Sequence, residues 1–240
     1  MKVKAVIAYD GSSYQGFQKQ KRTPQTVSHA IESALRSLQI TDSIVASGRT
    51  DAGVHATGQV IHFDLPSYWQ DPEKLKRALN RQLTDISFKH ISRVASGFHA
   101  RFSAQKRLYR YVFKTTTPSV FEHSYVSFYP TFDTARLAAA LHCFEGEHDF
   151  SCFHKSGTDT HTNIREIYKS IYQKRGNYHY IYFQANGFLR AQVRMMVEAS
   201  MMHAQGTLPL SALKEQIGAK IQHTTRLAPP QGLYLARITY

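Results

Sequence analysis

The stretch Gly48-Arg-Thr-Asp-Ala-Gly-Val-His55 separates two strand-like runs, residues 43–47 and 58–64, and so indicates a β-β connection in the first half of the chain. Glycines on both sides of Asp51 allow the backbone to turn sharply and to approach a ligand closely. A carboxylate on such a turn can act as a nucleophile, a base or a metal ligand. The neighbouring Arg49 is a natural phosphate contact. The alternative is an ordinary Asp-Gly-type turn between two strands.

The runs around this stretch predict the element order β-α-β-β-α-β. A strand is expected at residues 3–9, a helix at 26–38, the two strands named above, a second helix after Asp71, and a strand at 86–94. Asp71-Pro72-Glu73 has the pattern of a helix N-cap followed by a first-turn proline and a first-turn acid. The order is that of a ferredoxin-like unit.

The second half repeats this order with additions. Strands are expected at 107–114, 123–129, 164–173, 178–185 and 232–240, and helices at 134–144 (stopping near Gly146), 189–203 and 211–217. The sequence therefore predicts an α+β fold of two pseudo-duplicated ferredoxin-like halves, with mainly antiparallel sheets and a cleft between them. The predicted domains are residues 1–104, which carry Asp51, and residues 105–240.

Composition indicates a folded protein with a polyanionic partner. Hydrophobic residues make up 42% of the 240 residues and aromatic residues 12%, which excludes wholesale disorder. The formal net charge is +13, from 30 Lys and Arg against 17 Asp and Glu. Nucleic acid is the first candidate partner for such a balance, and a basic enzyme without such a partner is the alternative.

Cysteine usage and hydropathy predict a cytoplasmic protein. There are two cysteines, Cys143 and Cys152, as is usual in a reducing compartment. The apolar run at residues 5–8 is too short for a signal peptide, and no run has the length of a membrane span.

Two other motifs are weak. Gly11 to Gly16 has the glycine spacing of a P-loop, but Phe17-Gln18 stands where Lys-Ser/Thr is needed, so we interpret it as a loop with exposed polar tips. The possible zinc ligands are His142, Cys143, His148, Cys152, His154 and His161. Their spacing does not give the tight pairs that zinc prefers, so no metal is expected.

Basic residues are interleaved with aromatic ones. Lys19, Lys21 and Arg22 lie in the first loop, Arg101, Lys106, Arg107 and Arg110 surround the predicted domain junction, and Arg190 and Arg194 lie four apart on one helix. Arginines among aromatics suit phosphate contact and base stacking in RNA. The alternative is a solvated basic face over a core. We favour function for Arg49 and Arg110, and core for Tyr111 and Phe113.

Taken together, these residues resemble the tRNA pseudouridine synthases of the TruA family. The stretch at 48–55 is similar to the family's signature. Further similar blocks are Tyr9-Asp-Gly11 with Gly16-Phe-Gln18, Gln59 with His62 and Phe63, Phe98 to Ala104, Tyr109-Arg-Tyr111, Gly146 with His148-Asp-Phe150, Val193-Arg194, and Gly232-Leu-Tyr-Leu235. Departures are Gln192 for a usual methionine, Glu198 for a usual glycine, and Thr84 where a proline-containing turn is usual.

The resemblance implies an isomerase that converts uridine to pseudouridine without a cofactor or metal. It assigns the essential catalytic carboxylate to Asp51, a partner that keeps this group ionised to Arg194, and stacking on the uracil to Tyr109. Whether Asp51 attacks C1′, adds to the base or removes a ribose proton stays open.

The resemblance also implies a substrate and an assembly. The family modifies positions 38 to 40 in the anticodon arm of tRNA and works as a homodimer. The expected substrate contacts are Arg49, Tyr109, Leu233, Arg101 and Arg110. Two other classes compete: a non-catalytic RNA-binding protein of two RRM-like units, and a zinc hydrolase.

Overall fold

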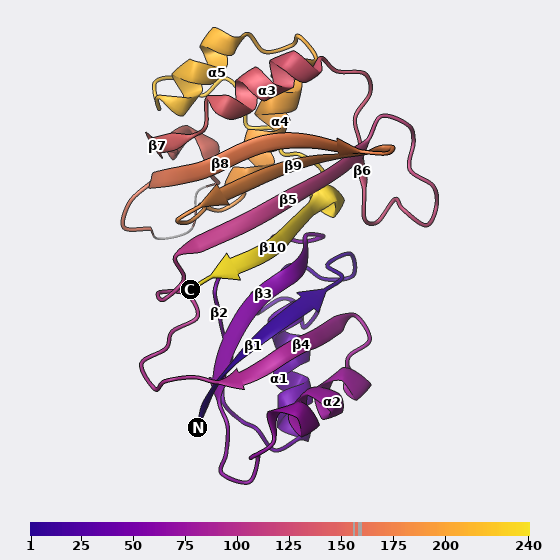
Figure 1. The fold of residues 1–240 in the computed structure, drawn as a ribbon, viewed down its shortest axis with the longest axis vertical. Coiled ribbons are helices and arrows are strands. Elements are labelled where there is room, and N and C mark those ends of the chain that lie inside the picture. The colour runs from indigo at the N-terminus through magenta and orange to yellow at the C-terminus, as the bar shows by residue number, and fades with distance from the viewer. Residues whose placement is uncertain (156, 158–159) are drawn as a thin grey trace. The chain divides into compact units, whose positions relative to one another are not determined.

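The computed structural model describes residues 1–155, 157 and 160–240 and has an α+β fold (Figure 1). The chain divides into two compact units. Unit 1 consists of Met1–Gln105 together with Tyr234–Tyr240, and unit 2 of Lys106–Leu233. Strand pairs are mostly antiparallel within each unit. The ferredoxin-like duplication and the domain division after residue 104 stay predictions.

Unit 1 is a sheet with two helices. Its elements are β1 (Lys2–Tyr9), α1 (Val27–Ser37), β2 (Val45–Ala46), β3 (His55–Asp64), α2 (Pro72–Gln82), β4 (Ile86–Arg93) and most of β10 (Leu233–Thr239). The strand order is β4-β1-β3-β10, and β2 also pairs with β3. β1 is antiparallel to both neighbours, so that Val6 lies opposite Val60 and His90. β10 runs parallel to β3, with Tyr234 opposite His55.

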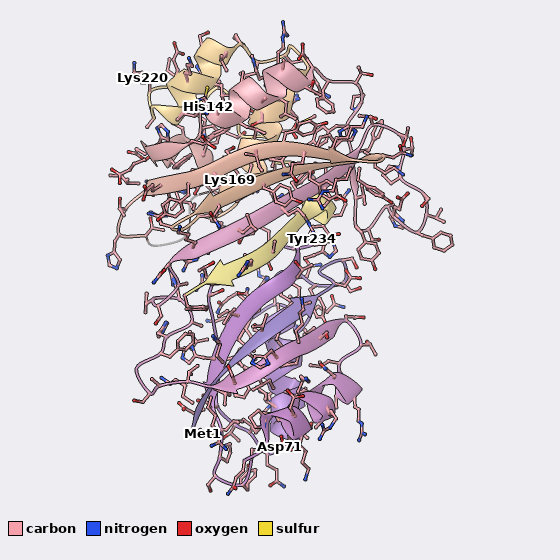
Figure 2. All side chains as sticks on the ribbon, in the orientation of Figure 1. Met1, Asp71, His142, Lys169, Lys220 and Tyr234 are labelled. Atoms are coloured by element: carbon pink, nitrogen blue, oxygen red, sulfur yellow. The ribbon has the colours of Figure 1, made fainter. Side chains whose placement is uncertain are left out.

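Local sequence explains these elements. Alternate residues of β1 are buried, because successive side chains of a strand point to opposite faces. The predicted cap of α2 is confirmed: the carboxylate of Asp71 accepts from the N–H groups of Glu73 at 2.8 Å and Lys74 at 3.1 Å. These backbone bonds, that of Lys74 above all, lower the pKa of Asp71, which Figure 2 labels beside the helix. α2 packs against β4 and also contacts α1.

Unit 2 consists of paired strands and three helices. Its elements are β5 (Lys106–Lys114), β6 (Ser127–Phe128), α3 (Thr134–His142), β7 (Gly146–Asp149), β8 (Ile164–Arg175), β9 (Tyr178–Ala185), α4 (Gln192–Ala204) and α5 (Leu210–Ile217), with short 3₁₀ turns at Ser151–Phe153 and Pro230–Gly232. The strand order is β5-β9-β8-β7, and β6 pairs in parallel with β5. α3 packs on β8 and α4, and α5 on α4 (Figure 1). Tyr111 and Phe113 are fully buried, which confirms them as core.

The structure differs from the sequence prediction at several element ends. β3 begins at His55, three residues earlier than predicted, so the end of the 48–55 stretch is strand. α3 ends at His142, and Gly146, with φ of +99°, opens β7, a short polar strand that was not predicted. The predicted strand 123–129 shortens to two residues, because the segment before it is a hydrogen-bonded loop.

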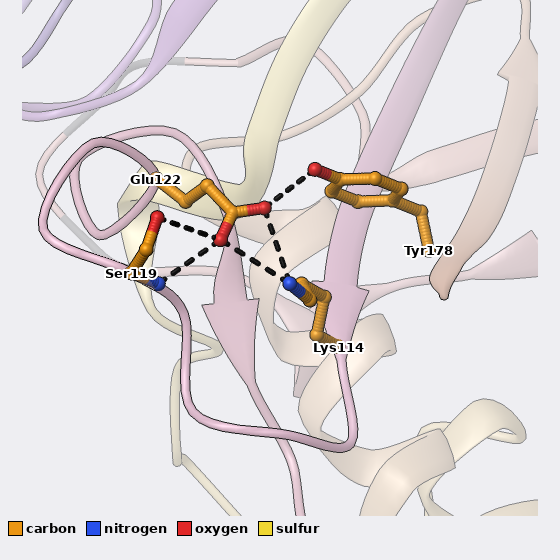
Figure 3. Close-up of polar contacts among 4 residues, drawn as sticks. All are labelled: Lys114, Ser119, Glu122 and Tyr178. Atoms are coloured by element: carbon orange, nitrogen blue, oxygen red, sulfur yellow. Dashed lines mark hydrogen bonds and ion pairs between the residues drawn. The ribbon is translucent and has the colours of Figure 1, made fainter. Parts of the chain in front are cut away.

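That loop is held by the carboxylate of Glu122 (Figure 3). Its two oxygens accept from the hydroxyl of Tyr178 at 2.5 Å, from Lys114 Nζ at 3.2 Å, and from the N–H and hydroxyl of Ser119 at 3.0 and 2.9 Å. The Tyr178 bond first, and then those of Ser119, lower the pKa of Glu122 to about 2. One charged group therefore ties the loop to β5 and β9.

The depressed pKa of Glu122 gives a pH-dependent stability. Stabilisation by the ionised carboxylate is complete above the ordinary pKa of 4.5 and is lost as the pH falls through about 2. We expect Glu122→Gln to lower the urea midpoint of unfolding at pH 7. The difference in this midpoint between wild type and variant is expected to become smaller as the pH falls from 4.5 to 2. The matched control is Glu147→Gln, at an exposed position on β7. If the difference in urea midpoint does not change with pH, the ionised carboxylate of Glu122 is not the source of the stabilisation.

The parallel pairing of β10 with β3 depends on a glycine. A Cβ on Gly58 would lie 2.3 Å from the carbonyl oxygen of Ala236. We expect Gly58→Ala to destabilise the protein by about 1–3 kcal/mol, because the strands must separate to relieve the overlap. Gly97→Ala, where no atom lies within 4 Å of the added Cβ, is expected to change stability by less than about 0.5 kcal/mol. Equal denaturation midpoints for the two variants would refute the pairing.

Candidate functional site

The loop that carries Asp51 is anchored at its start by a buried glutamine. Gln59, on β3, accepts from the hydroxyl of Ser47 at 2.6 Å and donates through Nε2 to the carbonyl of Gly48 at 2.8 Å. The N–H of Ser47 also bonds to the carbonyl of Val60 at 2.8 Å. Gln59 has no exposed surface, and its bonds fix where the loop leaves β2.

Asp51 begins a tight turn. The N–H of Val54 bonds to the carbonyl of Asp51 at 3.2 Å, and Gly53 has φ of +73°, as the third position of a type II turn requires. Thr50 is buried, and its hydroxyl lies 2.8 Å from that of Tyr9. Asp51 itself is half-buried and Arg49 is exposed. The turn is common to both interpretations of the motif, and it holds a half-buried carboxylic acid residue in a defined place.

The first loop, between β1 and α1, braces this turn through its backbone. The N–H of Phe17 bonds to the carbonyl of Thr50 at 3.0 Å, and the N–H of Gly53 bonds to the carbonyl of Tyr14 at 3.3 Å. Burial first, and then the nearby Asp85 and Asp10, raise the pKa of Tyr14. The residues on both sides of Asp51 are therefore each tied to the first loop.

Gly11 allows the two loops to meet. A Cβ at this position would lie 2.1 Å from the carbonyl oxygen of Val54, and the N–H of Gly11 bonds to Nδ1 of His55 at 2.9 Å. The ring of His55 stacks on that of Tyr234 at 4.8 Å, and Tyr234 is labelled in Figure 2. Sequence reasoning missed this brace. Its signal was the glycine spacing, which was interpreted only as a loop with polar tips.

Arg101 lies on a turn fixed by two histidines. Nδ1 of His62 accepts from the N–H of Ala100 at 3.1 Å, and Nδ1 of His99 accepts from those of Arg101 and Phe102 at 3.2 Å. Burial, followed by the charges of His99 and Lys2, lowers the pKa of His62 and favours its neutral, accepting form. Arg101 is exposed on this ordered turn.

Tyr109 and Arg110 are successive residues of β5 in unit 2. Tyr109 is 8% exposed, lies opposite Phe183 of β9, and meets the ring of Phe188 edge-on at 5.2 Å. Arg110 is half-buried and points to the other face of the strand. A phenol packed in this way has a fixed ring plane, as a stacking partner needs.

Arg194, on α4, is joined twice to the segment before β10. Its Nε donates to the carbonyl of Ala228 at 2.7 Å, and its own carbonyl accepts from the N–H of Ala228 at 3.1 Å. The hydroxyl of Tyr111 donates to the carbonyl of Pro229 at 3.0 Å. Leu233, which follows this segment, is 4% exposed. The segment therefore links α4 to β5, the strand of Tyr109.

The two residues of α4 that differ from those usual in the family, Gln192 and Glu198, are each held by a hydrogen bond. Gln192 is fully buried, and its Oε1 accepts from the N–H of Leu189 at 2.7 Å, which closes the turn that begins the helix. Oε2 of Glu198 accepts from the hydroxyl of Tyr129 at 2.7 Å. Burial first, and then the charges of Tyr111 and Glu198, raise the pKa of Tyr129 and keep it a donor.

In the described part of the chain, the candidate metal ligands do not form a cluster. Within residues 1–155, 157 and 160–240, no three His, Cys, Asp or Glu side chains are grouped as a metal site. His142 and His148, for example, lie against the carboxylate and the carbonyl of Glu145, respectively. None of the helices in these ranges is long and apolar enough to cross a bilayer.

The predicted site residues fall into two groups. Arg49, Asp51 and Arg101 belong to unit 1, and Tyr109, Arg110, Arg194 and Leu233 belong to unit 2. Within unit 1, Arg49 and Asp51 share one braced loop. The pairing of Asp51 with Arg194 stays a prediction.

Comparison with known proteins identifies the family. Residues 5–103 and 140–240 match a family model described as tRNA pseudouridine synthase. The chain is 39% identical over 241 residues to tRNA pseudouridine synthase A of Campylobacter jejuni, an alignment that covers 100% of both chains. It is 40% identical to the protein of that name from Helicobacter hepaticus, over 99% of this chain and 98% of the relative. The chain with the braced Asp51 turn therefore belongs to the tRNA pseudouridine synthase family.

Proposed function

We propose that this chain isomerises uridine to pseudouridine at positions 38, 39 and 40 in the anticodon stem-loop of tRNA, with Asp51 as the essential catalytic group. The observation that carries the proposal is the presentation of Asp51, which is half-buried on a turn braced by backbone bonds on both sides. Such preorganisation is what a catalytic group needs, because a misplacement of one ångström is costly in rate.

The reaction is balanced without a co-reactant. The N1–C1′ bond breaks, the uracil turns, a C5–C1′ bond forms, and the proton on C5 is lost while N1 gains one. No electron is gained or lost overall, so we propose that no cofactor takes part. Asp51 acts in its ionised form by one of three routes: attack on C1′, addition to the base, or removal of a ribose proton.

Tyr109 and Arg194 complete the proposed catalytic set. The packed ring of Tyr109 suits stacking on the uracil and help with the C5 proton. Arg194 is held by Ala228 through its Nε, and a guanidinium group oriented in this way suits a carboxylate partner. We propose that this carboxylate is that of Asp51.

The remaining proposed contacts bind the RNA. Arg49 holds the strand from which the target nucleotide is displaced, Leu233 lines the pocket for the uracil, and Arg101 and Arg110 contact phosphates. The exposure of Arg49 and Arg101 supports their roles. We further propose, from the family resemblance, that the protein works as a homodimer in the cytoplasm.

The two halves of the chain, residues 1–104 and 105–240, are proposed to be copies of one ferredoxin-like unit. In unit 1 the chain order is β1-α1-β2-β3-α2-β4. In the second half, β5-α3-β8-β9-α4-β10 follows the same order with short elements inserted. This repetition supports duplication.

Replacement of Asp51 tests the assignment. We expect Asp51→Asn to abolish pseudouridine formation in unmodified tRNA while tRNA affinity stays within several-fold of wild type, because shape and hydrogen bonding are kept and the charge is lost. Product is mapped after incubation without nucleotide and with a metal chelator.

The matched control is Asp64→Asn, at the exposed end of β3, which is expected to keep wild-type turnover. Turnover by Asp51→Asn near that of wild type would overturn the catalytic role. It would favour a non-catalytic RNA-binding protein or a different active residue.

The salt dependence of tRNA binding tests the phosphate contacts. Two to five such contacts predict that affinity falls roughly tenfold to several-hundredfold between 50 and 200 mM salt, through counterion release. Filter binding or fluorescence titration at a series of salt concentrations measures the slope. Binding that is flat over this range would contradict a phosphate-tracking surface.

A further inference from the structure

The first loop carries a basic turn that the catalytic assignment leaves unused. We call residues 19–24 the basic turn, because they include Lys19, Lys21 and Arg22. Together with His29 of α1, this segment lines a surface depression of about 290 Å³. Lysine and arginine side chains have only donors, so the depression suits an anion.

The backbone of the basic turn is ordered by its own hydrogen bonds. Gln20 and Thr23 form an antiparallel bridge that leaves Lys21 and Arg22 at the tip. Nε2 of Gln20 donates to the carbonyl of Gln15 at 2.6 Å, and the hydroxyl of Thr23 accepts from the N–H of Gln25 at 3.1 Å. The two cations therefore stand on a preformed support, which reduces the entropy lost on binding.

The charge that faces solvent comes from the tip. Lys19 is paired with the buried carboxylate of Glu32, so its charge is largely compensated. In the part of the chain that the structure describes, neither Lys21 nor Arg22 has an ion pair, and both are exposed.

The depression also adjoins the positive end of a helix. α1 begins at Val27, has eleven residues, and carries no acidic residue in its first turn. No carboxylate therefore repels an anion there, but the N–H groups of Val27 and Ser28 are bonded to the carbonyls of Gly16 and Phe17, so the helix contributes the side chain of His29 to the depression and not free N–H donors.

The basic turn is mechanically connected to the catalytic loop. The N–H of Phe17, two residues before Lys19, donates a hydrogen bond to the carbonyl of Thr50. The carbonyl of Tyr14 accepts one from the N–H of Gly53. The N–H groups of Val27 and Ser28, at the start of α1, bond to the carbonyls of Gly16 and Phe17 at 3.2 and 2.9 Å. One hydrogen-bonded segment thus presents the cations and braces the turn of Asp51.

We propose that Lys21 and Arg22, with His29, bind a phosphodiester of the tRNA backbone outside the reacting nucleotide. The contact fixes the RNA to the same segment that positions Asp51. The inference rests on the proposed function, since tRNA is the ligand, but it concerns binding rather than the chemical step.

The test is the salt slope of tRNA binding to a Lys21→Ala/Arg22→Ala variant. We expect affinity at about 100 mM salt to fall roughly tenfold or more, and the slope of log affinity against log salt to decrease in magnitude by about one to two. The rate of pseudouridine formation at saturating enzyme is expected to stay within about threefold of wild type, because neither side chain takes part in the reaction.

Two controls separate a site from a general charge effect. Lys74→Ala/Arg77→Ala removes two exposed cations from α2 in the same unit and is expected to leave the slope unchanged. Lys21→Arg/Arg22→Lys keeps the charge and is expected to keep the slope. A wild-type slope in the alanine variant, or an equal loss in the α2 control, overturns the inference.

The outcome is also distinguishable from failure of the proposed function. If the wild-type protein forms no pseudouridine but the alanine variant loses tRNA affinity and slope, the phosphate site stands and the catalytic proposal falls. If wild type is active and the alanine variant binds as wild type does, the phosphate site alone falls.

Discussion

The placement of Asp51 depends on one close backbone contact, the approach of Gly11 to Val54. Any side chain at position 11 would overlap the carbonyl of Val54. With glycine there, the end of β1 and the start of β3 meet, and the first loop comes within hydrogen-bonding reach of Thr50 and Gly53. β1 has a neighbouring strand on each side in the sheet. The turn that carries the carboxylate is therefore attached to a rigid central strand.

Elements with a strong local signal could be predicted from the sequence. In β1, buried and partly exposed residues alternate strictly. The start of α2 is predicted by Asp71-Pro72, because this cap forms without any residue from elsewhere in the chain. β7 could not be predicted, because Gly146-Glu-His-Asp149 has no apolar alternation and becomes a strand only by pairing with β8. β6 is short for a similar reason: Glu122 fixes the preceding loop through Lys114 and Tyr178, which lie elsewhere in the chain.

The sequence singled out Asp51 as a candidate catalytic residue, but it did not reveal what supports the turn of Asp51. Asp51 stands out in the sequence because the glycines around it are unusual. The bonds that tie its turn to the first loop are between backbone groups, and Gly11 is the residue type that indicates this close approach. The two residues of α4 that differ from the family pattern, Gln192 and Glu198, also depend on partners that the sequence does not reveal. Glu198 is understandable only with Tyr129, which lies 69 positions earlier and donates to its carboxylate. A comparison of single positions does not reveal such compensation.

The parallel pairing of β10 with β3 has a consequence for biosynthesis. β10 follows the whole of unit 2 in the chain, yet Tyr234 and Leu235 pair with His55 and Ala56, next to the turn of Asp51. While the ribosome is still making unit 2, this edge of β3 has unpaired backbone groups and is open to wrong strand partners. A nascent chain thus contains residues 48–55 long before the strand that pairs beside them has been made, and translation must pass residue 235 before this pairing can form.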